Sequence, residues 1–386
     1  MKKKICIMTA TRAEYGLLKP LIKKLQYNDN FDTRIVVTGA HLCSEFGFTY
    51  KEIENDGFVI DEKIDILLSS DSPSAVTKTM GLALISFASY FERLNPDLLI
   101  ILGDRYETLA VSVAAFNQRI PIAHLHGGEI TEGALDDSIR HSITKLSYIH
   151  FTSTEVYRQR VIQLGENPKR VFNVGAIGIE NIKNEKLLSR EELFSTLKID
   201  NFDKIAIVTY HPVTLEKNSS ENQINNLLEA ITSYKDIAFI ITKANADSEG
   251  RRINKILENY IVDKSNLFLF DSLGVTKYLS GLKYCEFVIG NSSSGIIEAP
   301  SFKISTINIG NRQNGRIQAN SIINCDNSRQ SIQNSIDLVL SKKYKNSLNK
   351  VINPYGDGEV SSKIIKEIER ILLFEEINIM KQFYDI

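Results

Sequence analysis

Residues 124–141 read H-L-H-G-G-E-I-T-E-G-A-L-D-D-S-I-R-H, and they gather three histidines, four carboxylates and an arginine into one short stretch. The stretch follows an apolar, strand-like run at 120–123, breaks at a Gly-Gly pair, and re-enters a helical pattern at 136–149. These side chains are therefore expected at the carboxyl end of a strand, where open α/β sheets bind ligands. The structural alternative is a hydrated loop in which Asp136 or Asp137 only caps the next helix.

The same order of strand, turn and helix recurs along the chain. Apolar runs that predict strands lie at 4–10, 33–38, 97–102, 120–123, 149–152 and 171–174, and then at 204–210, 237–242, 268–270, 284–289 and 305–309. Strands that alternate with helices predict right-handed βαβ units and a parallel sheet covered on both faces. We therefore expect an α/β protein with two doubly wound, Rossmann-like domains that face a cleft.

The domain boundary is expected near 175–190, where the sequence lacks a clear apolar period. This places an N-terminal domain at 1–178 and a C-terminal domain at 179–358. The remaining residues, 359–386, contain an amphipathic helical pattern at 359–380 and are expected to cross back to the N-terminal domain.

Composition excludes several classes of partner. The 386 residues are 43% hydrophobic and 24% charged, with a formal net charge of -1, so neither nucleic acid nor an acidic membrane surface is expected to bind. No apolar run approaches the roughly 18–20 residues of a membrane helix, and Arg12 ends the first apolar run too early for a secretory signal. Four scattered cysteines indicate reduced thiols, which is typical of a cytoplasmic protein.

A second group of acid and base candidates lies in G-D-R-Y-E, residues 103–107. Asp104 and Glu107 follow a very apolar strand, and burial of a carboxylate raises its pKa towards neutrality. His211, before a proline, is either a site residue or a simple hydrogen bonder at a strand end. His124 and His126 would point the same way in a strand, but the paired ligand motifs of zinc sites are absent, so no metal is expected.

The segment G-N-S-S-S-G-I-I-E, residues 290–298, predicts an anion site between a strand and a helix, because small residues let backbone amides approach a phosphate. A Ser-rich cap and turn is the alternative. The chain lacks the P-loop lysine and any G-x-G-x-x-G, which disfavours triphosphates and dinucleotides. Glu298 is suited to accept both hydroxyls of a ribose, and Arg312, Arg316 and Arg12 are suited to pair with a diphosphate.

Seven motifs of this sequence resemble those of hydrolysing UDP-N-acetylglucosamine 2-epimerases. In chain order they are T-R-A-E-Y-G, G-D-R-Y-E, H-L-H-G-G-E, D-D-S-I-R-H-S-I-T-K, H-P-V-T, G-N-S-S-S-G-I-I-E and I-N-I-G-N-R-Q-N-G-R. These enzymes belong to sialic acid synthesis, and the bacterial capsule enzymes resemble this chain in particular. The resemblance implies a fold of the glycosyltransferase-B type, UDP held mainly by the second domain, and no metal or nicotinamide cofactor.

Site residues follow from the resemblance position by position. It implies that the nucleotide is held by Arg12, His211, Asn245, Ser292, Ser293, Glu298 and Arg312. It implies acid and base roles for Asp104, Glu129 and Asp137, which Arg105 and Arg140 position. Some members of the family carry a carboxylate in place of His126, so this histidine stays a further candidate for the base.

The implied reaction converts UDP-N-acetylglucosamine and water to N-acetylmannosamine and UDP, by elimination to a glycal and rehydration. One alternative is the same reaction on UDP-2,4-diacetamido-2,4,6-trideoxyglucose, a sugar of the legionaminic acid pathway. Others are a non-hydrolysing epimerase, a retaining glycosyltransferase of the same fold, and a nucleotide-sugar binding protein without turnover. The expected partners are a small nucleotide sugar and further copies of the chain, as a homodimer or homotetramer.

Overall fold

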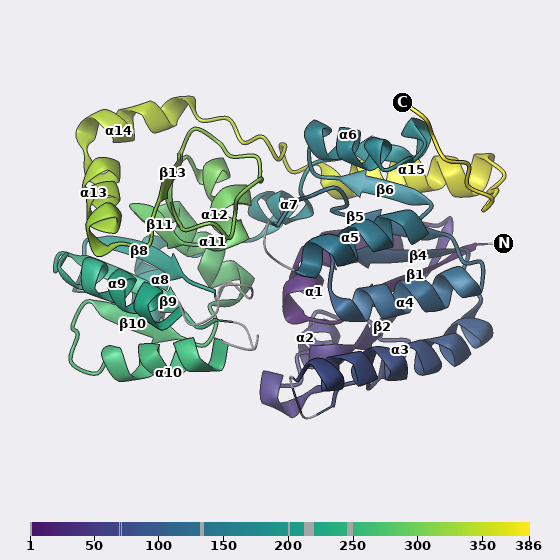
Figure 1. The fold of residues 1–386 in the computed structure, drawn as a ribbon, viewed down its shortest axis with the longest axis horizontal. Coiled ribbons are helices and arrows are strands. Elements are labelled where there is room, and N and C mark those ends of the chain that lie inside the picture. Colours follow the sequence, from purple (N-terminus) through teal and green to yellow (C-terminus); the bar gives the residue numbers. More distant parts are fainter. Residues whose placement is uncertain are drawn as a thin grey trace. The chain divides into compact units, whose positions relative to one another are not determined.

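A computed structural model describes residues 2–68, 70, 72–131, 135–199, 201–211, 220–244 and 250–386. The chain forms two compact units (Figure 1). Unit 1 comprises Met1–Glu129, Leu135–Lys183 and Tyr355–Ile386. Unit 2 comprises Ile130–Ala134 and Asn184–Pro354.

Unit 1 is built on a seven-stranded parallel sheet with the strand order β3-β2-β1-β4-β5-β6-β7. The strands are β1 (Lys3–Thr9), β2 (Phe31–Thr38), β3 (Glu62–Ile64), β4 (Leu98–Leu102), β5 (Ile122–Leu125), β6 (Ile149–Thr152) and β7 (Val171–Asn173). The sequence predicts all of them except β3, a three-residue edge strand too short to show an apolar period.

Helices cover both faces of this sheet because its strands are apolar on both sides. They are α1 (Arg12–Gln26), α2 (Tyr50–Asn55), α3 (Pro73–Leu94), α4 (Tyr106–Asn117), α5 (Leu135–Leu146), α6 (Glu155–Gln163), α7 (Ile177–Asn184) and α15 (Val360–Phe374). In β1, Ile5 and Ile7 enter the core formed with α1 and α15, whereas Cys6 and Met8 enter the core formed with α3 and α4. No helix in the described ranges has the length and apolarity that a membrane span requires.

Unit 2 repeats the plan with a six-stranded parallel sheet, ordered β10-β9-β8-β11-β12-β13. Its strands are β8 (Lys204–Thr209), β9 (Ile237–Thr242), β10 (Leu267–Phe270), β11 (Phe287–Gly290), β12 (Ser305–Ile309) and β13 (Ile322–Cys325). Its α-helices are α8 (Arg190–Leu197), α9 (Ser220–Thr232), α10 (Gly250–Tyr260), α11 (Gly274–Tyr284), α12 (Ser293–Ile297), α13 (Arg329–Leu340) and α14 (Lys342–Ser347). Two doubly wound parallel sheets confirm the predicted fold class.

The final helix is shorter than its sequence pattern predicts. The helical period extends to 380, but α15 ends at Phe374 and the rest of the chain carries no helix. Contacts with the segment after α6 replace the helical hydrogen bonds there: Lys381 Nζ lies 2.7 Å from a Glu166 carboxylate oxygen, and the Tyr384 amide donates to the Gly165 carbonyl at 3.0 Å.

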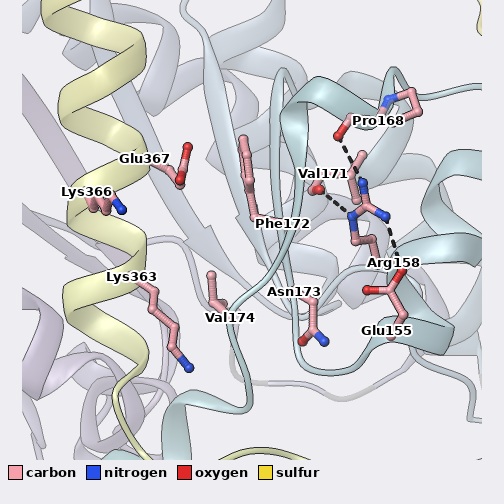
Figure 2. A pocket seen from close by; sticks show the side chains of 10 residues that line it. All are labelled: Glu155, Arg158, Pro168, Val171, Phe172, Asn173, Val174, Lys363, Lys366 and Glu367. Carbon is pink, nitrogen blue, oxygen red and sulfur yellow. Dashed lines mark hydrogen bonds and ion pairs between the residues drawn. The ribbon is translucent and has the colours of Figure 1, made fainter.

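A hollow of about 500 Å³ opens beside β7, the edge strand of unit 1 (Figure 2). Arg158 of α6 lies in it and donates to the carbonyls of Val171 and Pro168, at 2.8 and 3.3 Å, while pairing with Glu155 at 3.1 Å. The Arg158 guanidinium occupies a backbone carbonyl of the edge strand, and it therefore hinders the pairing of this strand with a strand of another chain. The hollow lies beside the edge of the sheet, and its lining residues include none of the candidate acids and bases.

Candidate active site

The candidate acids and bases of unit 1 lie just beyond the carboxyl ends of neighbouring strands. Asp104 follows β4, His126 follows β5, and these strands pair in parallel through Leu102 and Leu125. Parallel strands end at the same edge of a sheet, so residues far apart in sequence meet there. The strand order therefore brings the G-D-R-Y-E and H-G-G-E motifs together.

The Gly-Gly pair after β5 is required by close packing. Gly128 has φ +79, and a Cβ built on it would lie 2.5 Å from the Tyr157 carbonyl oxygen of α6. A side chain at this position would force the loop away from α6 and would also strain the backbone. Glycine thus lets the chain turn sharply before Glu129, which is 4% exposed.

Arg140 of α5 organises the carboxylates. Its side chain is among the largest fully buried ones in the described chain, and its guanidinium donates to the Glu129 carbonyl at 2.6 Å and to Asp137 at 2.9 Å. A further hydrogen bond joins it to Asp104. Burial disfavours the charged guanidinium, but Asp104 and Glu129 outweigh this effect and raise the pKa of Arg140. One cation therefore holds residues from three segments in fixed positions.

Arg105 takes a different partner from the one the sequence suggests. Its guanidinium pairs with both carboxylate oxygens of Glu107, at 3.2 and 3.1 Å, and Glu107 is itself buried. Burial raises the pKa of the nearby Glu14 to about 7, although Arg105 opposes the shift. No described hydrogen bond or ion pair joins Arg105 to Asp104, so of the two arginines it is Arg140 that contacts Asp104, Asp137 and the backbone of Glu129.

The two histidines of H-L-H have different surroundings, contrary to the expectation that they point the same way. His124 lies inside β5, fully buried, and its Nε2 donates to the Gly103 carbonyl at 2.8 Å. His126 lies after the strand with φ +66, so the alternation of side chains has ended. Among the described residues, no group of three or more His, Cys, Asp or Glu side chains is arranged to hold a metal ion.

We expect buried histidines to make the folded protein sensitive to mild acid. Burial lowers the pKa of His124 to about 3 and that of His41 to about 4, whereas an unfolded histidine titrates near 6.5. Between these values the unfolded chain binds more protons, so the free energy of unfolding should fall as pH drops from about 6.5 to 4.5. Urea unfolding across this pH range measures the free energy of unfolding, and its dependence on pH should be weaker for His124→Gln. A wild-type free energy of unfolding that does not change with pH would contradict the lowered histidine pKa values.

In unit 2, a close approach of two strand ends builds the first part of the candidate nucleotide site. Gly290 has φ +136, and a Cβ there would lie 1.9 Å from the Thr209 carbonyl oxygen, so only glycine fits. The next residue, Asn291, accepts from the His211 amide at 2.7 Å and donates to the His211 carbonyl at 2.8 Å. Burial, and secondarily Arg312, lower the pKa of His211 to about 3.

Two long polar side chains lie at this pair of strand ends. Arg312 and Gln313 both donate to the Asn291 carbonyl, at 3.0 and 2.8 Å. Arg316 lies 3.4 Å from the hydroxyl of Thr131, a residue that belongs to unit 2. The arrangement places the Arg312 guanidinium at the polar turn that follows β11.

The serine-rich turn forms a hydroxyl network with Glu298. Ser292 caps α12, and Ser293 is the first residue of that helix. Ser294 Oγ donates to Glu298 and also contacts the Tyr278 hydroxyl. Burial raises the pKa of Glu298 to about 7. Because α12 has only five residues, its dipole is weak, and the hydroxyls and arginines of this site offer more to an anion.

Of the two other expected nucleotide residues, one belongs to unit 1 and the other has no described position. Arg12 is the first residue of α1 in unit 1, is exposed, and lies 3.8 Å from Glu52. Asn245 falls outside the described residues.

Sequence reasoning missed several residues that the structure places in these clusters. They are Ser153, Tyr278, Asn291 and Gln313. None of them was predicted from the sequence to be a site residue. Asn291 stands inside the G-N-S-S-S-G motif, which was a usable signal. Ser153 follows β6 in an ordinary T-S-T run, and only the pairing of β5 with β6 brings it near Glu129.

Comparison with known proteins identifies the family. The family model for UDP-N-acetylglucosamine 2-epimerase matches residues 23–369. The chain belongs to this epimerase family. It is 45% identical to a Campylobacter jejuni protein named GDP/UDP-N,N'-diacetylbacillosamine 2-epimerase (hydrolyzing), with 100% of both chains covered. It is 37% identical to the Escherichia coli polysialic acid biosynthesis protein P7, covering 100% of this chain and 98% of that one.

Solved structures of the family share the fold. The UDP-GlcNAc 2-epimerase from Neisseria meningitidis, bound to UDP-GlcNAc, matches with a TM-score of 0.81 at 19% identity. The match covers 95% of this chain and 100% of that chain. The predicted fold of the glycosyltransferase-B type is therefore confirmed, and so is the resemblance at the level of the family.

Proposed function

We propose that this family member is a hydrolysing 2-epimerase of nucleotide-linked N,N'-diacetylbacillosamine, which is 2,4-diacetamido-2,4,6-trideoxyglucose. The products are the free 2-epimer and the nucleoside diphosphate. The observation that carries the proposal is the cluster in which buried Arg140 holds Asp104, Asp137 and the backbone of Glu129. The full-length relative from Campylobacter jejuni supports the choice of sugar.

The first half of the reaction is an elimination that needs a base. A carboxylate of unit 1 takes the proton from C2 of the sugar, the C1–C2 double bond forms, and the bond from C1 to the diphosphate oxygen breaks. The electron pair leaves with the nucleoside diphosphate, and a glycal remains. Positioned carboxylates contribute to such a step by proton transfer in the transition state.

The second half adds water to the glycal. The water oxygen bonds to C1 and gives its proton to a base, while an acid delivers a proton to C2 from the opposite face of the ring. C2 is thereby inverted, and the sugar leaves with a free anomeric hydroxyl. Two faces require at least two acid or base groups, and Asp104, Glu129 and Asp137 supply three within one cluster.

We assign the nucleotide to unit 2. Arg312 and Arg316 are suited to neutralise the departing diphosphate, which stabilises charge that develops as the C1–O bond breaks. The Glu298 carboxylate accepts a hydrogen bond from the Ser294 hydroxyl, and it is suited to accept hydrogen bonds from the hydroxyls of a ribose. His211 and the Asn291 turn lie beside these groups and complete the proposed nucleotide site.

The test is an assay of the purified protein in D₂O with UDP-linked and GDP-linked N,N'-diacetylbacillosamine. We expect nucleoside diphosphate and a free sugar that carries inverted C2 with deuterium at that carbon, identified by NMR. A product that keeps its nucleotide would instead show a non-hydrolysing epimerase. A requirement for an acceptor would show a glycosyltransferase, and binding without turnover would show a binding protein.

UDP-N-acetylglucosamine is the second candidate substrate, with N-acetylmannosamine as the product. The 37% identity to the polysialic acid biosynthesis protein P7 favours it, and the sialic acid and capsule role expected from the sequence depends on it. The two sugars differ at C4 and C6, so the comparison of kcat/KM for each in the same assay separates the two proposals.

Arg312→Ala should weaken UDP binding. The guanidinium is proposed to bond the diphosphate, and a hydrogen bond to a charged group contributes about 1.5 to 3 kcal/mol. Calorimetry with UDP should therefore show roughly a 10- to 100-fold higher Kd. Arg329→Ala is the matched control, because this arginine pairs with Glu229 at 3.3 Å on the surface of the same unit. Equal UDP affinities for wild type and Arg312→Ala would contradict the assignment.

A further inference from the structure

Ser153 lies directly after β6, in a position that the reaction scheme above leaves without a role. It is 1% exposed, and its hydroxyl donates to Oε1 of Glu129 at 2.8 Å. Glu129 is 4% exposed. A buried hydroxyl at hydrogen-bond distance from a buried carboxylate restricts rotation of that carboxylate.

His126 approaches the same carboxylate oxygen, and its partners fix its protonation pattern. The backbone amide of Ile177, the first residue of α7, donates to His126 Nε2 at 3.3 Å. Nε2 therefore carries a lone pair, and in the neutral ring the proton resides on Nδ1. Nδ1 lies 2.9 Å from Glu129 Oε1, so it donates to the carboxylate.

Two donors from different segments thus converge on one oxygen of Glu129. The backbone of His126 is held in the left-handed region, with φ +66, which few residues other than glycine adopt, although histidine is enriched there together with asparagine and aspartate. Its own amide bonds the Phe151 carbonyl of β6 at 2.8 Å, which anchors the strained residue to the strand that precedes Ser153. A strained residue kept by such bonds at a candidate site is a sign of a functional constraint.

We propose that Ser153 is a positioning residue for the Glu129 carboxylate and that His126 assists it as a hydrogen-bond donor through Nδ1. The inference deepens the proposed function and rests on it. Both donors engage Oε1 of Glu129. Both ring nitrogens of His126 are engaged as well, so the histidine does not act as the base at C2.

The first measurement is steady-state kinetics of Ser153→Ala on the sugar nucleotide that the wild type turns over. We expect kcat to fall about 10- to 100-fold, the size of one hydrogen bond to a charged group, while KM stays within about threefold. Ser153→Thr keeps the hydroxyl and should recover most of the lost kcat. The control is Ser147→Ala, which removes a fully buried serine hydroxyl bonded to the Ile143 carbonyl at 2.8 Å, and its kcat should be unchanged.

A double-mutant cycle separates a positioning role from a general loss of stability. If Ser153 acts through Glu129, adding Ser153→Ala to Glu129→Gln should cause little further loss of kcat, because the group to be positioned is already altered. Additive losses, or an unchanged kcat in Ser153→Ala beside an impaired Glu129→Gln, would overturn the positioning role alone. Failure of the wild type to release free sugar would overturn the proposed function, and the positioning role with it.

Discussion

Asp104→Asn is expected to lower kcat by about 10² to 10⁴-fold, the usual contribution of a general acid or base. Asparagine keeps the shape of the side chain and can still accept a hydrogen bond from Arg140, but it cannot take a proton at neutral pH. UDP affinity should stay within about threefold, because the proposed nucleotide contacts lie in unit 2. Single-turnover assays combined with UDP titration measure both quantities.

A matched control is available in the same unit. Asp32 also pairs with an arginine, Arg34, at 3.0 Å, but it lies at the amino end of β2, where no acid or base role is proposed. The Asp32→Asn variant should turn over substrate at the wild-type rate. Glu129→Gln and Asp137→Asn should behave like Asp104→Asn. Wild-type rates in two of the three site variants would refute the assignment of these carboxylates.

Arg140→Met should abolish turnover and also lower the free energy of unfolding by about 3 kcal/mol. Methionine fills much of the same volume, but it leaves the Glu129 carbonyl and two carboxylates without their shared donor. Removing one partner of a buried ion pair costs roughly 3 to 5 kcal/mol. We expect the lower end, because the side chains of Asp104 and Asp137 are 26% and 32% exposed and water can solvate them in part.

Arg158→Met provides the comparison. This arginine also bonds backbone carbonyls and a carboxylate, yet its side chain is 26% exposed and its carboxylate partner, Glu155, is 56% exposed. We expect a loss below about 1 kcal/mol and normal turnover, since exposed pairs contribute little. Urea unfolding measures the stability loss of each variant, and initial rates measure its turnover. Equal stability losses in both variants would show that the site arginine is no more important to the fold than one at the sheet edge.

The two candidate substrates share the groups to which the family motifs are assigned. The motifs that carry the resemblance are proposed to serve the reacting carbons and the diphosphate, and those parts are common to both candidate sugar nucleotides. No motif in this sequence is assigned to the groups at C4 and C6 of the sugar. The sequence therefore indicated the family, whereas the proposed preference for N,N'-diacetylbacillosamine depends on overall identity to a relative.

Local sequence determined the order of strands and helices and the position of each reactive motif. An apolar run such as 98–102 forms a strand because fully buried parallel strands need apolar side chains on both faces. The motifs follow such runs directly, so their location at the carboxyl ends of the strands could be predicted. β3, β13 and the end of α15 were not predicted. The two strands have only three and four residues, too few to show a period, and the end of α15 depends on tail contacts.

Only the tertiary structure decided which side chains meet. Arg105 and Arg140 are equally plausible partners of Asp104 in sequence, but Arg105 bonds Glu107, two residues away, and Arg140 reaches Asp104 from another helix. The pairing of β5 with β6 brings Ser153 to the Glu129 carboxylate. A positive φ at His126 brings the ring of this histidine to the Ile177 amide. Such contacts join residues that are distant in sequence, and they depend on strand order and single backbone torsions that no local pattern records.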